Sequence, residues 1–203
     1  MKIDEFVFLF DLDGTLINTD NIYIEVWNII LQKYNIEFNN YFFHSFIKGK
    51  SDVSFLKFLI NNISNEELND ISELKDKLFI EKLKNKNIVF DGVTNFLEKI
   101  KNSKIAIVTS CNKEAAEFII NKYKLNNYID LLISSEDVIN HKPHPEPYLK
   151  AMNILKAENN KCIIFEDSSA GYLSANKSNP FKTYIYDNKK NNDILKKSKY
   201  NFD

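Results

Sequence analysis

The stretch that decides the fold of this chain is Phe6-Val7-Phe8-Leu9-Phe10-Asp11-Leu12-Asp13-Gly14-Thr15-Leu16. Its leading apolar run has the length and composition of a buried strand. Asp11 and Asp13 follow at once, and side chains two residues apart lie on the same side of an extended segment. Buried parallel strands read as continuous apolar runs, and open α/β sheets bind ligands beyond the carboxyl ends of such strands. The stretch therefore predicts a strand that delivers two carboxylates to the edge of a sheet.

The close spacing of these two acids needs an explanation. Two carboxylates repel each other by about 4 kcal/mol at roughly 4 Å and an effective dielectric of about 20. A bound divalent cation would account for them. The alternative is a polar turn at the end of a strand, because Asp-Gly is a common turn pair. Partner residues further along the chain are needed to decide between the two.

Length and composition limit the kinds of protein that this chain can be. Its 203 residues fit one domain, with or without a modest insertion, and a hydrophobic content of 44% is ample for a core. The net charge of −1 gives no strong attraction to nucleic acid or to an anionic membrane. The sequence has no apolar run as long as a membrane span, and its N-terminus lacks the charged and cleavage regions of a signal peptide.

Cysteine and arginine usage adds further expectations. Cys111 and Cys162 do not make a disulfide framework, so a reducing, cytoplasmic setting is the simpler interpretation. All 27 basic residues are lysines. A phosphate group bound by this protein must therefore be held by lysine, backbone amides, hydroxyls or a metal, never by a guanidinium. We expect a monomer that binds neither nucleic acid nor membrane.

Residues 18–87 read as helices without a strand. Apolar residues recur at helical spacing over 21–34 and 53–60, and residues 35–43 between them read as a loop rich in asparagine and aromatic residues. Residues 64–86 form a longer helix with acids in its first turn and lysines at its end, which suits the helix dipole.

This helical segment lies between the first strand and a region that alternates strands and helices, which is the arrangement of an inserted cap. We therefore expect a core of residues 1–17 and 88–203 with a helical cap of residues 18–87. The alternative is a set of ordinary helices packed on the sheet. Thr19 or Asp20 is expected to cap the first helix of the segment.

The region after the helical segment predicts a doubly wound parallel sheet of the α/β class, because strands and helices alternate in it. We expect the strands at residues 104–108, 130–133, 162–165 and 183–186. We expect the helices at residues 92–100, 113–124, 145–156 and 169–177. The tail, rich in asparagine and lysine, is expected to be solvated surface or a final helix.

Three further segments place reactive side chains after strands or in rigid loops. Thr109 and Ser110 follow the second strand. Lys142 lies in a segment stiffened by three of the chain's four prolines, Pro143, Pro145 and Pro147. Glu166 and Asp167 follow another buried strand, and they would add two more carboxylates to the same edge. Such a cluster of acids requires a cation, and oxygen ligands select a hard ion such as Mg²⁺.

Taken in order, these segments resemble the four motifs of the haloacid dehalogenase superfamily, in its branch of small helical-cap enzymes that includes phosphoglycolate phosphatase and β-phosphoglucomutase. The resemblance covers nearly the whole chain. It implies that Asp11 is a nucleophile that becomes an aspartyl-phosphate and that Asp13 is the general acid and base. It also implies that Thr109 bonds a phosphoryl oxygen, with Ser110 as the other candidate hydroxyl, and that Lys142 bridges the nucleophile and the phosphate.

The same resemblance implies a Mg²⁺ site. Its ligands would be Asp11, the backbone carbonyl of Asp13, and Asp167, with Glu166 either a further ligand or a support for the site. Contacts to the substrate are expected from the turn after the first strand, at Gly14 and Thr15. The implied activity is Mg²⁺-dependent hydrolysis of a small phosphorylated metabolite.

The identity of the substrate depends on the helical segment. Residues 46–52 resemble the part of the cap that helps members of the family to choose a substrate, and phosphomutases usually carry an arginine where this chain has Asp52. The negative charge of Asp52 is expected to repel a second phosphate, which favours a phosphatase over a β-phosphoglucomutase-like phosphomutase. The lysines that could replace the arginine are Lys48, Lys50 and Lys113.

The sequence also allows a protein without enzymatic activity. A non-catalytic interaction protein could keep the same fold, although the intact acids and Lys142 argue against it. His141 and His144 are candidate pocket residues, with exposed positions in the loop as the favoured alternative.

Overall fold

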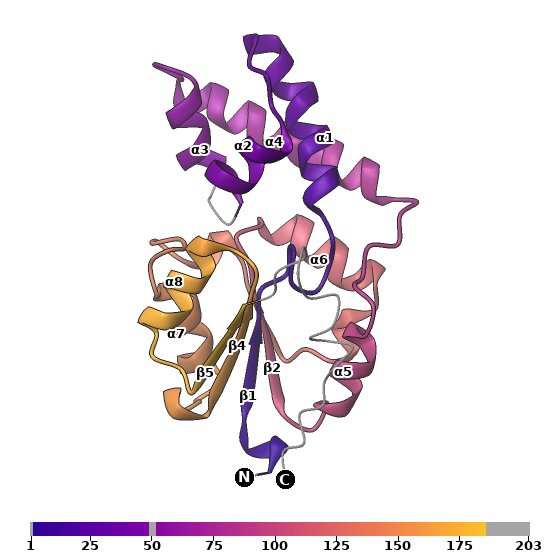
Figure 1. Cartoon of the computed structure of the whole chain (residues 1–203), viewed down its shortest axis with the longest axis vertical. Coiled ribbons are helices and arrows are strands. Elements are labelled where there is room, and N and C mark those ends of the chain that lie inside the picture. Colours follow the sequence, from indigo (N-terminus) through magenta and orange to yellow (C-terminus); the bar gives the residue numbers. More distant parts are fainter. Residues whose placement is uncertain (1, 49–51, 186–203) are drawn as a thin grey trace.

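The computed structural model describes residues 2–48 and 52–185, which form a five-stranded sheet surrounded by helices (Figure 1). The strands lie in the order β3-β2-β1-β4-β5 across the sheet, and each neighbouring pair is parallel. Their bounds are Val7–Phe10 for β1, Lys104–Val108 for β2, Leu131–Ile133 for β3, Cys162–Glu166 for β4 and Lys182–Ile185 for β5. The predicted doubly wound α/β fold is confirmed.

The register of the central strands sets up the site. Phe10 of β1 pairs with Ile107 of β2 on one side and with Phe165 of β4 on the other, so these strands end nearly level. Parallel strands present their carboxyl ends at the same edge of a sheet. This edge carries the residues that follow the three strands, namely Asp11, Thr109 and Asp167.

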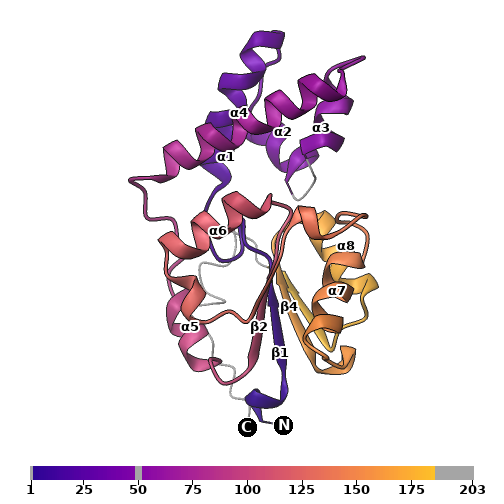
Figure 2. The same ribbon diagram turned by 180° about the vertical axis from the view of Figure 1, so that it is seen from behind.

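Two helices cover each face of the sheet. Helices α5 (Val93–Lys99) and α6 (Lys113–Lys122) lie on one face, and α7 (Glu146–Ile154) and α8 (Ser169–Lys177) lie on the other (Figure 2). The alternation of β1 side chains explains this division. Phe8 packs in the cluster that holds Phe96 of α5, whereas Leu9 packs in a second cluster with Tyr148 of α7 and Ala175 of α8.

The helices of the segment between β1 and α5 gather beyond the carboxyl edge of the sheet (Figure 1). They are α1 (Asp20–Leu31), α2 (Asn40–Phe42), α3 (Asp52–Leu59) and α4 (Asn65–Leu83). Short 3₁₀ turns occur at Ile3–Glu5, Gln32–Tyr34, Leu125–Asn127, Ser135–Asp137 and Asn159–Lys161, and a π-helical turn at Phe43–Ile47. In the described part of the chain, no helix has the length and apolarity needed to cross a bilayer. The cap boundaries at residues 18 and 87 stay a prediction.

The prediction of a loop over residues 35–43 is wrong at its C-terminal end, where α2 forms. The side chain of Asn39 accepts a hydrogen bond from the backbone N–H of Phe42 at 2.9 Å and so caps this short helix. Phe38 and Phe43 on either side of it are buried in the main cluster, so tertiary packing holds a turn that lacks helical periodicity in the sequence. The helix considered for the tail, beyond residue 185, lies outside the described residues.

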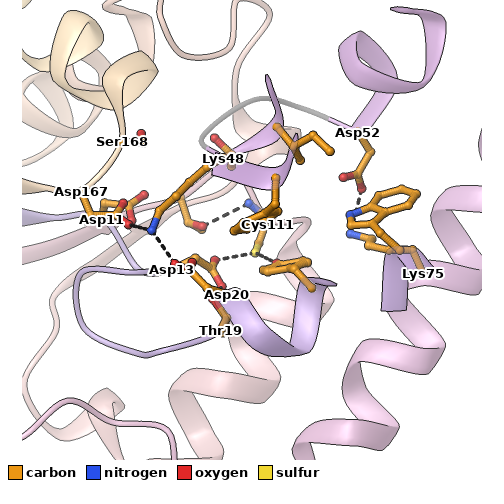
Figure 3. A pocket seen from close by; sticks show the side chains of 16 residues that line it. Asp11, Asp13, Thr19, Asp20, Lys48, Asp52, Lys75, Cys111, Asp167 and Ser168 are labelled. Carbon is orange, nitrogen blue, oxygen red and sulfur yellow. Dashed lines mark hydrogen bonds and ion pairs between the residues drawn. The ribbon is translucent and has the colours of Figure 1, made fainter. Parts of the chain in front are cut away.

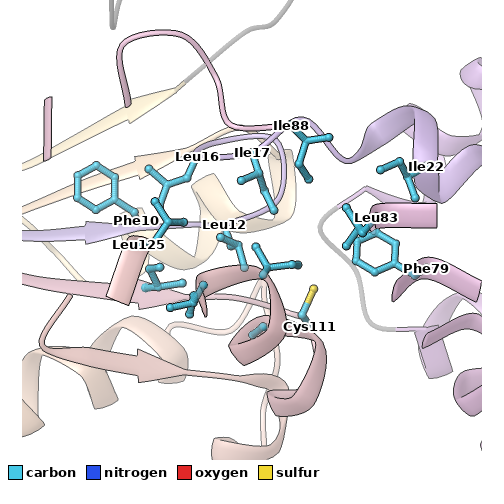
Figure 4. Close-up of a cluster of buried hydrophobic side chains, with 14 of the residues drawn as sticks. Phe10, Leu12, Leu16, Ile17, Ile22, Phe79, Leu83, Ile88, Cys111 and Leu125 are labelled. Atoms are coloured by element: carbon cyan, nitrogen blue, oxygen red, sulfur yellow. The ribbon is translucent and has the colours of Figure 1, made fainter. Parts of the chain in front are cut away.

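The helices beyond the sheet share one apolar core with it (Figure 4). Phe10, Leu12 and Ile17 come from β1 and the turn after it, and they belong to the same buried cluster as Ile22 of α1 and Phe79 of α4. Fully burying one such side chain contributes about 1.5–3 kcal/mol. The apolar contacts therefore hold α1 and α4 over the edge of the sheet where the acids lie.

Candidate active site

A tight turn after β1 brings the acids into position. Gly14 has a φ of +88°, a left-handed conformation that suits glycine, and its N–H donates to the carbonyl of Ile17 at 2.7 Å. A Cβ on Gly14 would lie 1.8 Å from Oδ2 of Asp167, so a side chain at position 14 would collide with this carboxylate. Gly14 thus lets β1 and β4 bring their acids together. The hydroxyl of the neighbouring Thr15 is buried and has no hydrogen-bond partner among the described groups.

Lys142 lies at the centre of the acids. Its Nζ donates hydrogen bonds to Oδ1 of Asp11 at 2.7 Å, to Oε1 of Glu166 at 2.7 Å and to the carbonyl of Val108 at 2.9 Å. Burial alone would lower the pKa of this ammonium, but the two carboxylates outweigh burial and raise it. Burial raises the pKa of Asp11, and the charge of Lys142 opposes that shift. Lys142 therefore stays charged beside the proposed nucleophile.

Glu166 holds Lys142 from the other side. Its side chain is fully buried, and Oε1 also accepts a hydrogen bond from the hydroxyl of Tyr148 at 2.6 Å. Oε2 accepts from the Ser168 hydroxyl at 3.2 Å and from the Asp167 N–H at 3.1 Å. Both oxygens of Glu166 thus already have donors, which fits a residue that fixes the lysine and the start of α8.

A hard cation fits the carboxylates at this edge of the sheet. Asp11, Glu166 and Asp167 each offer a carboxylate oxygen within 4.8 Å of the others. Oδ2 of Asp11 is buried and has no hydrogen-bond partner among the described groups. Burial raises the pKa of Asp167 to about 7, against the opposing charge of Lys48. Oxygen donors with an unpartnered buried carboxylate oxygen match the ligand preference of Mg²⁺.

Asp13 points away from this cluster, toward the helices above it. Its Oδ1 accepts a hydrogen bond from the Thr19 hydroxyl at 2.7 Å, and its Oδ2 accepts from Sγ of Cys111 at 2.9 Å. Sγ of Cys111 lies 3.1 Å from the hydroxyl oxygen of Tyr23. Burial raises the pKa of Asp13, and the bonds from Cys111 and Thr19 oppose the shift. A raised carboxyl pKa suits a group that must donate a proton near neutral pH.

The prediction that the side chain of Thr19 or Asp20 caps α1 is therefore wrong, although Thr19 does occupy the N-cap position. Thr19 is the residue before the helix, but its side chain makes no capping hydrogen bond and binds Asp13 instead. Asp20, the other candidate, is the first residue of α1, and its carboxylate pairs with Lys48. Both polar side chains at this helix start face the site.

A cavity of about 70 Å³ lies between these acids and the helices (Figure 3). Thr109 and Ser110 line its floor, and Oγ1 of Thr109 accepts a hydrogen bond from the N–H of Cys111 at 3.1 Å. Its apolar lining comes from the helical segment and consists of Tyr23, Trp27, Phe43 and Ile47. The cavity is therefore polar toward the sheet, whereas its helical side carries both aromatic and charged side chains.

Lys48 reaches from the helical segment to the sheet. Its Nζ lies 2.6 Å from Oδ2 of Asp167 and 2.8 Å from Oδ2 of Asp20. Although burial alone would lower the pKa of Lys48, these two carboxylates raise it to about 12. Lys48 thus lines the cavity, as expected, but both of its contacts are carboxylates.

Lys75 also lines the cavity, and sequence reasoning missed it. It lies on α4 between Ile71 and Phe79, four residues from each, so it occupies the buried stripe of that helix. Its Nζ contacts Oδ2 of Asp52 at 2.8 Å and Oδ1 of Asp76 at 2.5 Å. A lysine inside an apolar helical stripe was the available signal.

The other candidates lie away from the cavity or outside the described residues. Lys113 is exposed at the start of α6, and its backbone N–H donates to Glu136 at 2.8 Å. His141 and His144 are exposed, in agreement with the favoured alternative. Lys50 lies outside the described residues.

A parallel sheet with a buried lysine among acids at its carboxyl edge, under a helical cover, is the arrangement of a phosphoryl-transfer enzyme. The model of the haloacid dehalogenase-like hydrolase family matches residues 8–182, and the chain belongs to this family. The predicted family is therefore confirmed. The prediction of a phosphatase of this superfamily is confirmed as well, since its relatives include named phosphatases.

Individual relatives cover most of the chain. It is 28% identical to a phosphorylated carbohydrates phosphatase of Thermotoga maritima, over 82% of this chain and 78% of the relative. It is 29% identical to a pyrophosphatase of Bacillus cereus, over 79% of this chain and 73% of the relative. The crystal structure of β-phosphoglucomutase from Clostridium difficile is similar, with a TM-score of 0.78 and 28% identity, covering 87% of this chain and 82% of that one.

Proposed function

We propose that the protein hydrolyses small phosphate monoesters through a phosphoryl group transferred to Asp11. The observation that carries this proposal is the buried ammonium of Lys142, 2.7 Å from Oδ1 of Asp11, beside an Asp11 Oδ2 that has no hydrogen-bond partner among the described groups. Burying a carboxylate oxygen without a partner costs free energy of folding, which indicates that this oxygen has a role in binding or catalysis. Relatives named as phosphatases agree with this activity.

Each step uses groups at the edge of the sheet. The Asp11 carboxylate attacks phosphorus, and Asp13 donates its proton to the leaving oxygen. Asp13, now a carboxylate, removes a proton from water as that water attacks the phosphoryl group, which restores Asp11 and releases phosphate. Thr109 or Ser110 and the N–H groups around Gly14 would hold the phosphoryl oxygens.

The positive charge for this reaction comes from Lys142 and from a metal. Asp11 and Asp167 would ligate Mg²⁺, together with the backbone carbonyl of Asp13, and the ion would offset the repulsion between the nucleophile and the phosphate. Glu166, whose oxygens already accept hydrogen bonds, would position Lys142 rather than bind the ion. Residues 18–87 would act as the cap that excludes bulk water. Cytoplasmic location and a monomeric state remain parts of this proposal.

A phosphomutase is the second candidate, because the fold and sequence resemble those of a β-phosphoglucomutase. A mutase must grip a second phosphate under the cap while the first is on Asp11. In the described part of the cavity, Lys48 and Lys75 are the cations available on the helical side, and each contacts two carboxylates. This pairing favours hydrolysis.

The test is release of inorganic phosphate from a panel of sugar phosphates, nucleotides, phosphoglycolate and pyrophosphate, with Mg²⁺ present. The Asp11→Asn variant should lose turnover, because an amide cannot attack phosphorus, whereas the matched change at an exposed acid, Asp4→Asn, should keep it. Acid-quenched wild-type enzyme should carry phosphate on the peptide that contains Asp11. Full activity of Asp11→Asn would refute the assignment of Asp11 as the nucleophile. A wild-type protein that hydrolyses none of these substrates would favour the alternative of a non-catalytic interaction protein.

A further inference from the structure

The ring of Tyr148 lies against the buried ammonium of Lys142. Tyr148 is in the first turn of α7 and is fully buried among the side chains that pack this helix on the sheet. Nζ of Lys142 is 5.1 Å from the centre of the ring, within the range of a cation–π contact. The hydroxyl donates a hydrogen bond to Oε1 of Glu166 at 2.6 Å. Tyr148 thus contacts both members of the ion pair that faces Asp11.

Two carboxylates compete for the charge of Lys142. An ammonium has three N–H donors, and Lys142 uses them on Asp11, on Glu166 and on the carbonyl of Val108. Both carboxylate oxygens lie 2.7 Å from Nζ. A stronger pull by Glu166 would draw the ammonium away from the proposed nucleophile. The position of Lys142 therefore depends on how much of the charge of Glu166 is taken up by other donors.

The hydroxyl of Tyr148 takes up part of that charge at the oxygen that Lys142 contacts. Oε1 of Glu166 accepts from both groups, so the tyrosine and the lysine share one acceptor. Burial and the charge of Glu166 raise the pKa of Tyr148 well above its usual value, so the hydroxyl keeps its proton and stays a donor. Hydrogen bonds to a charged acceptor are the strong ones. This bond therefore fixes the carboxylate and weakens its pull on the ammonium.

We propose that Tyr148 is a positioning residue that holds the ammonium of Lys142 against Asp11, with its hydroxyl on Glu166 and its ring against Nζ. This inference rests on the proposed phosphoryl transfer and adds a residue to it. Tyr148 does not line the cavity, so it acts through the groups it contacts and not by touching the substrate. Its effect is expected in the transfer step, where the ammonium offsets the repulsion between the nucleophile and the phosphate.

The test is Tyr148→Phe, which removes the hydroxyl and keeps the ring. Propyl phosphate has a poor leaving group, so transfer to Asp11 should limit its turnover. For this substrate, kcat should fall about tenfold, as expected for a lost hydrogen bond to a charged group, while KM changes less than about twofold. Tyr148→Leu removes the ring as well and should lower kcat further. A variant that only loses stability keeps its kcat per folded molecule, so a kcat near that of the wild type, or a change confined to KM, would overturn the role.

The matched control is Tyr34→Phe. The hydroxyl of Tyr34 donates to Oε1 of Glu67 at 2.6 Å, so this change removes a bond of the same kind and length within the helical segment. Its kcat should equal that of the wild type. In a Glu166→Gln background, Tyr148→Phe should change kcat less than about twofold, because the hydroxyl acts through the carboxylate that this background lacks. A full loss in that background, or an equal loss in Tyr34→Phe, would contradict the proposed route.

A measurement without turnover separates this inference from the proposed function. In protein labelled with ¹⁵N-lysine, NMR follows the exchange of buried ammonium hydrogens with water, and the Lys142 signal is identified by its loss in Lys142→Met. Tyr148→Phe should make this exchange about tenfold faster, since the same lost bond no longer restrains Lys142. Exchange at Lys75, a lysine of the helical segment whose side chain is 6% exposed, should not change. If the wild type hydrolyses no monoester, the proposed function fails, and the exchange rate then decides alone: a faster rate at Lys142 supports the positioning role, and an unchanged rate overturns it.

Discussion

Replacing Lys142 by methionine should destabilise the protein strongly as well as inactivate it. The ammonium lies 2.7 Å from a carboxylate oxygen of Asp11 and 2.7 Å from one of Glu166. At an effective dielectric of about 20, each attraction at that separation is worth about 6 kcal/mol before the cost of burying the charges. Removing one partner of a buried ion pair costs about 3–5 kcal/mol, because the remaining charges are left uncompensated.

The expected loss converts to a measurable change in melting temperature. For a chain of this size, 1 kcal/mol corresponds to about 2–4 °C, so Lys142→Met should melt about 6–20 °C below the wild type. Thermal unfolding followed by circular dichroism in EDTA measures this directly. Adding Mg²⁺ should raise the melting temperature of Lys142→Met more than that of the wild type, because a cation relieves the repulsion that the lysine no longer offsets.

The surface pair of Lys101 and Glu98 supplies the control. Its Nζ and carboxylate oxygen are 2.5 Å apart, but both side chains are more than half exposed, so Lys101→Met should change stability by at most about 1 kcal/mol. Adding Glu166→Gln to Lys142→Met should cost less than the sum of the two single changes, because the lysine and the acid act on each other. A melting temperature of Lys142→Met within about 2 °C of the wild type would refute the reasoning, since that corresponds to about 1 kcal/mol or less.

Three other changes test the rest of the site. Cys111→Ala should slow turnover of an alkyl phosphate more than that of nitrophenyl phosphate, because the thiol positions the acid Asp13 and a good leaving group needs less protonation; Cys111→Ser should restore turnover of the alkyl phosphate, and equal losses with both substrates in Cys111→Ala would contradict this role. Gly14→Ala should abolish turnover and lower the melting temperature, since its Cβ would lie 1.8 Å from Asp167; a variant with wild-type kinetics would show that the turn is not needed. EDTA should remove activity, Mg²⁺ should restore it and Ca²⁺ should restore little, because its larger, looser coordination spoils the in-line geometry; activity in excess EDTA would rule out the metal site.

The part of the site that follows strands could be predicted from the sequence. Asp11 and Thr109 come directly after an apolar run, and Asp167 comes one residue after such a run. Parallel strands bring these positions to the same edge of the sheet, whatever the length of chain between the strands. Lys142 was predictable for a different reason, since the prolines around it form a string specific enough to match a family motif.

The helical side of the site was not predictable in the same way. Thr19 is a residue type that often caps helices. Its hydroxyl makes no capping hydrogen bond because Asp13 lies close enough in three dimensions to accept one from it instead. Cys111 meets Tyr23 across 88 positions of the sequence, so no local pattern joins them. Lys75 gave a local signal, a charge in an apolar stripe, but its partner Asp52 lies on another helix, and periodicity does not specify how helices pair.

The two cysteines give the protein an internal reporter of movement between the helices and the sheet. Cys162 is the first residue of β4 and is fully buried in the sheet, and burial raises the pKa of its thiol to about 11. Cys111 belongs to the sheet side of the cavity but touches Tyr23 of α1, so the helices themselves cover it. Because a thiol reagent attacks an accessible thiolate, the rate at which Cys111 is alkylated would measure any movement of α1 away from the sheet. Alkylation of Cys111 would thus report any opening of the site without an added label.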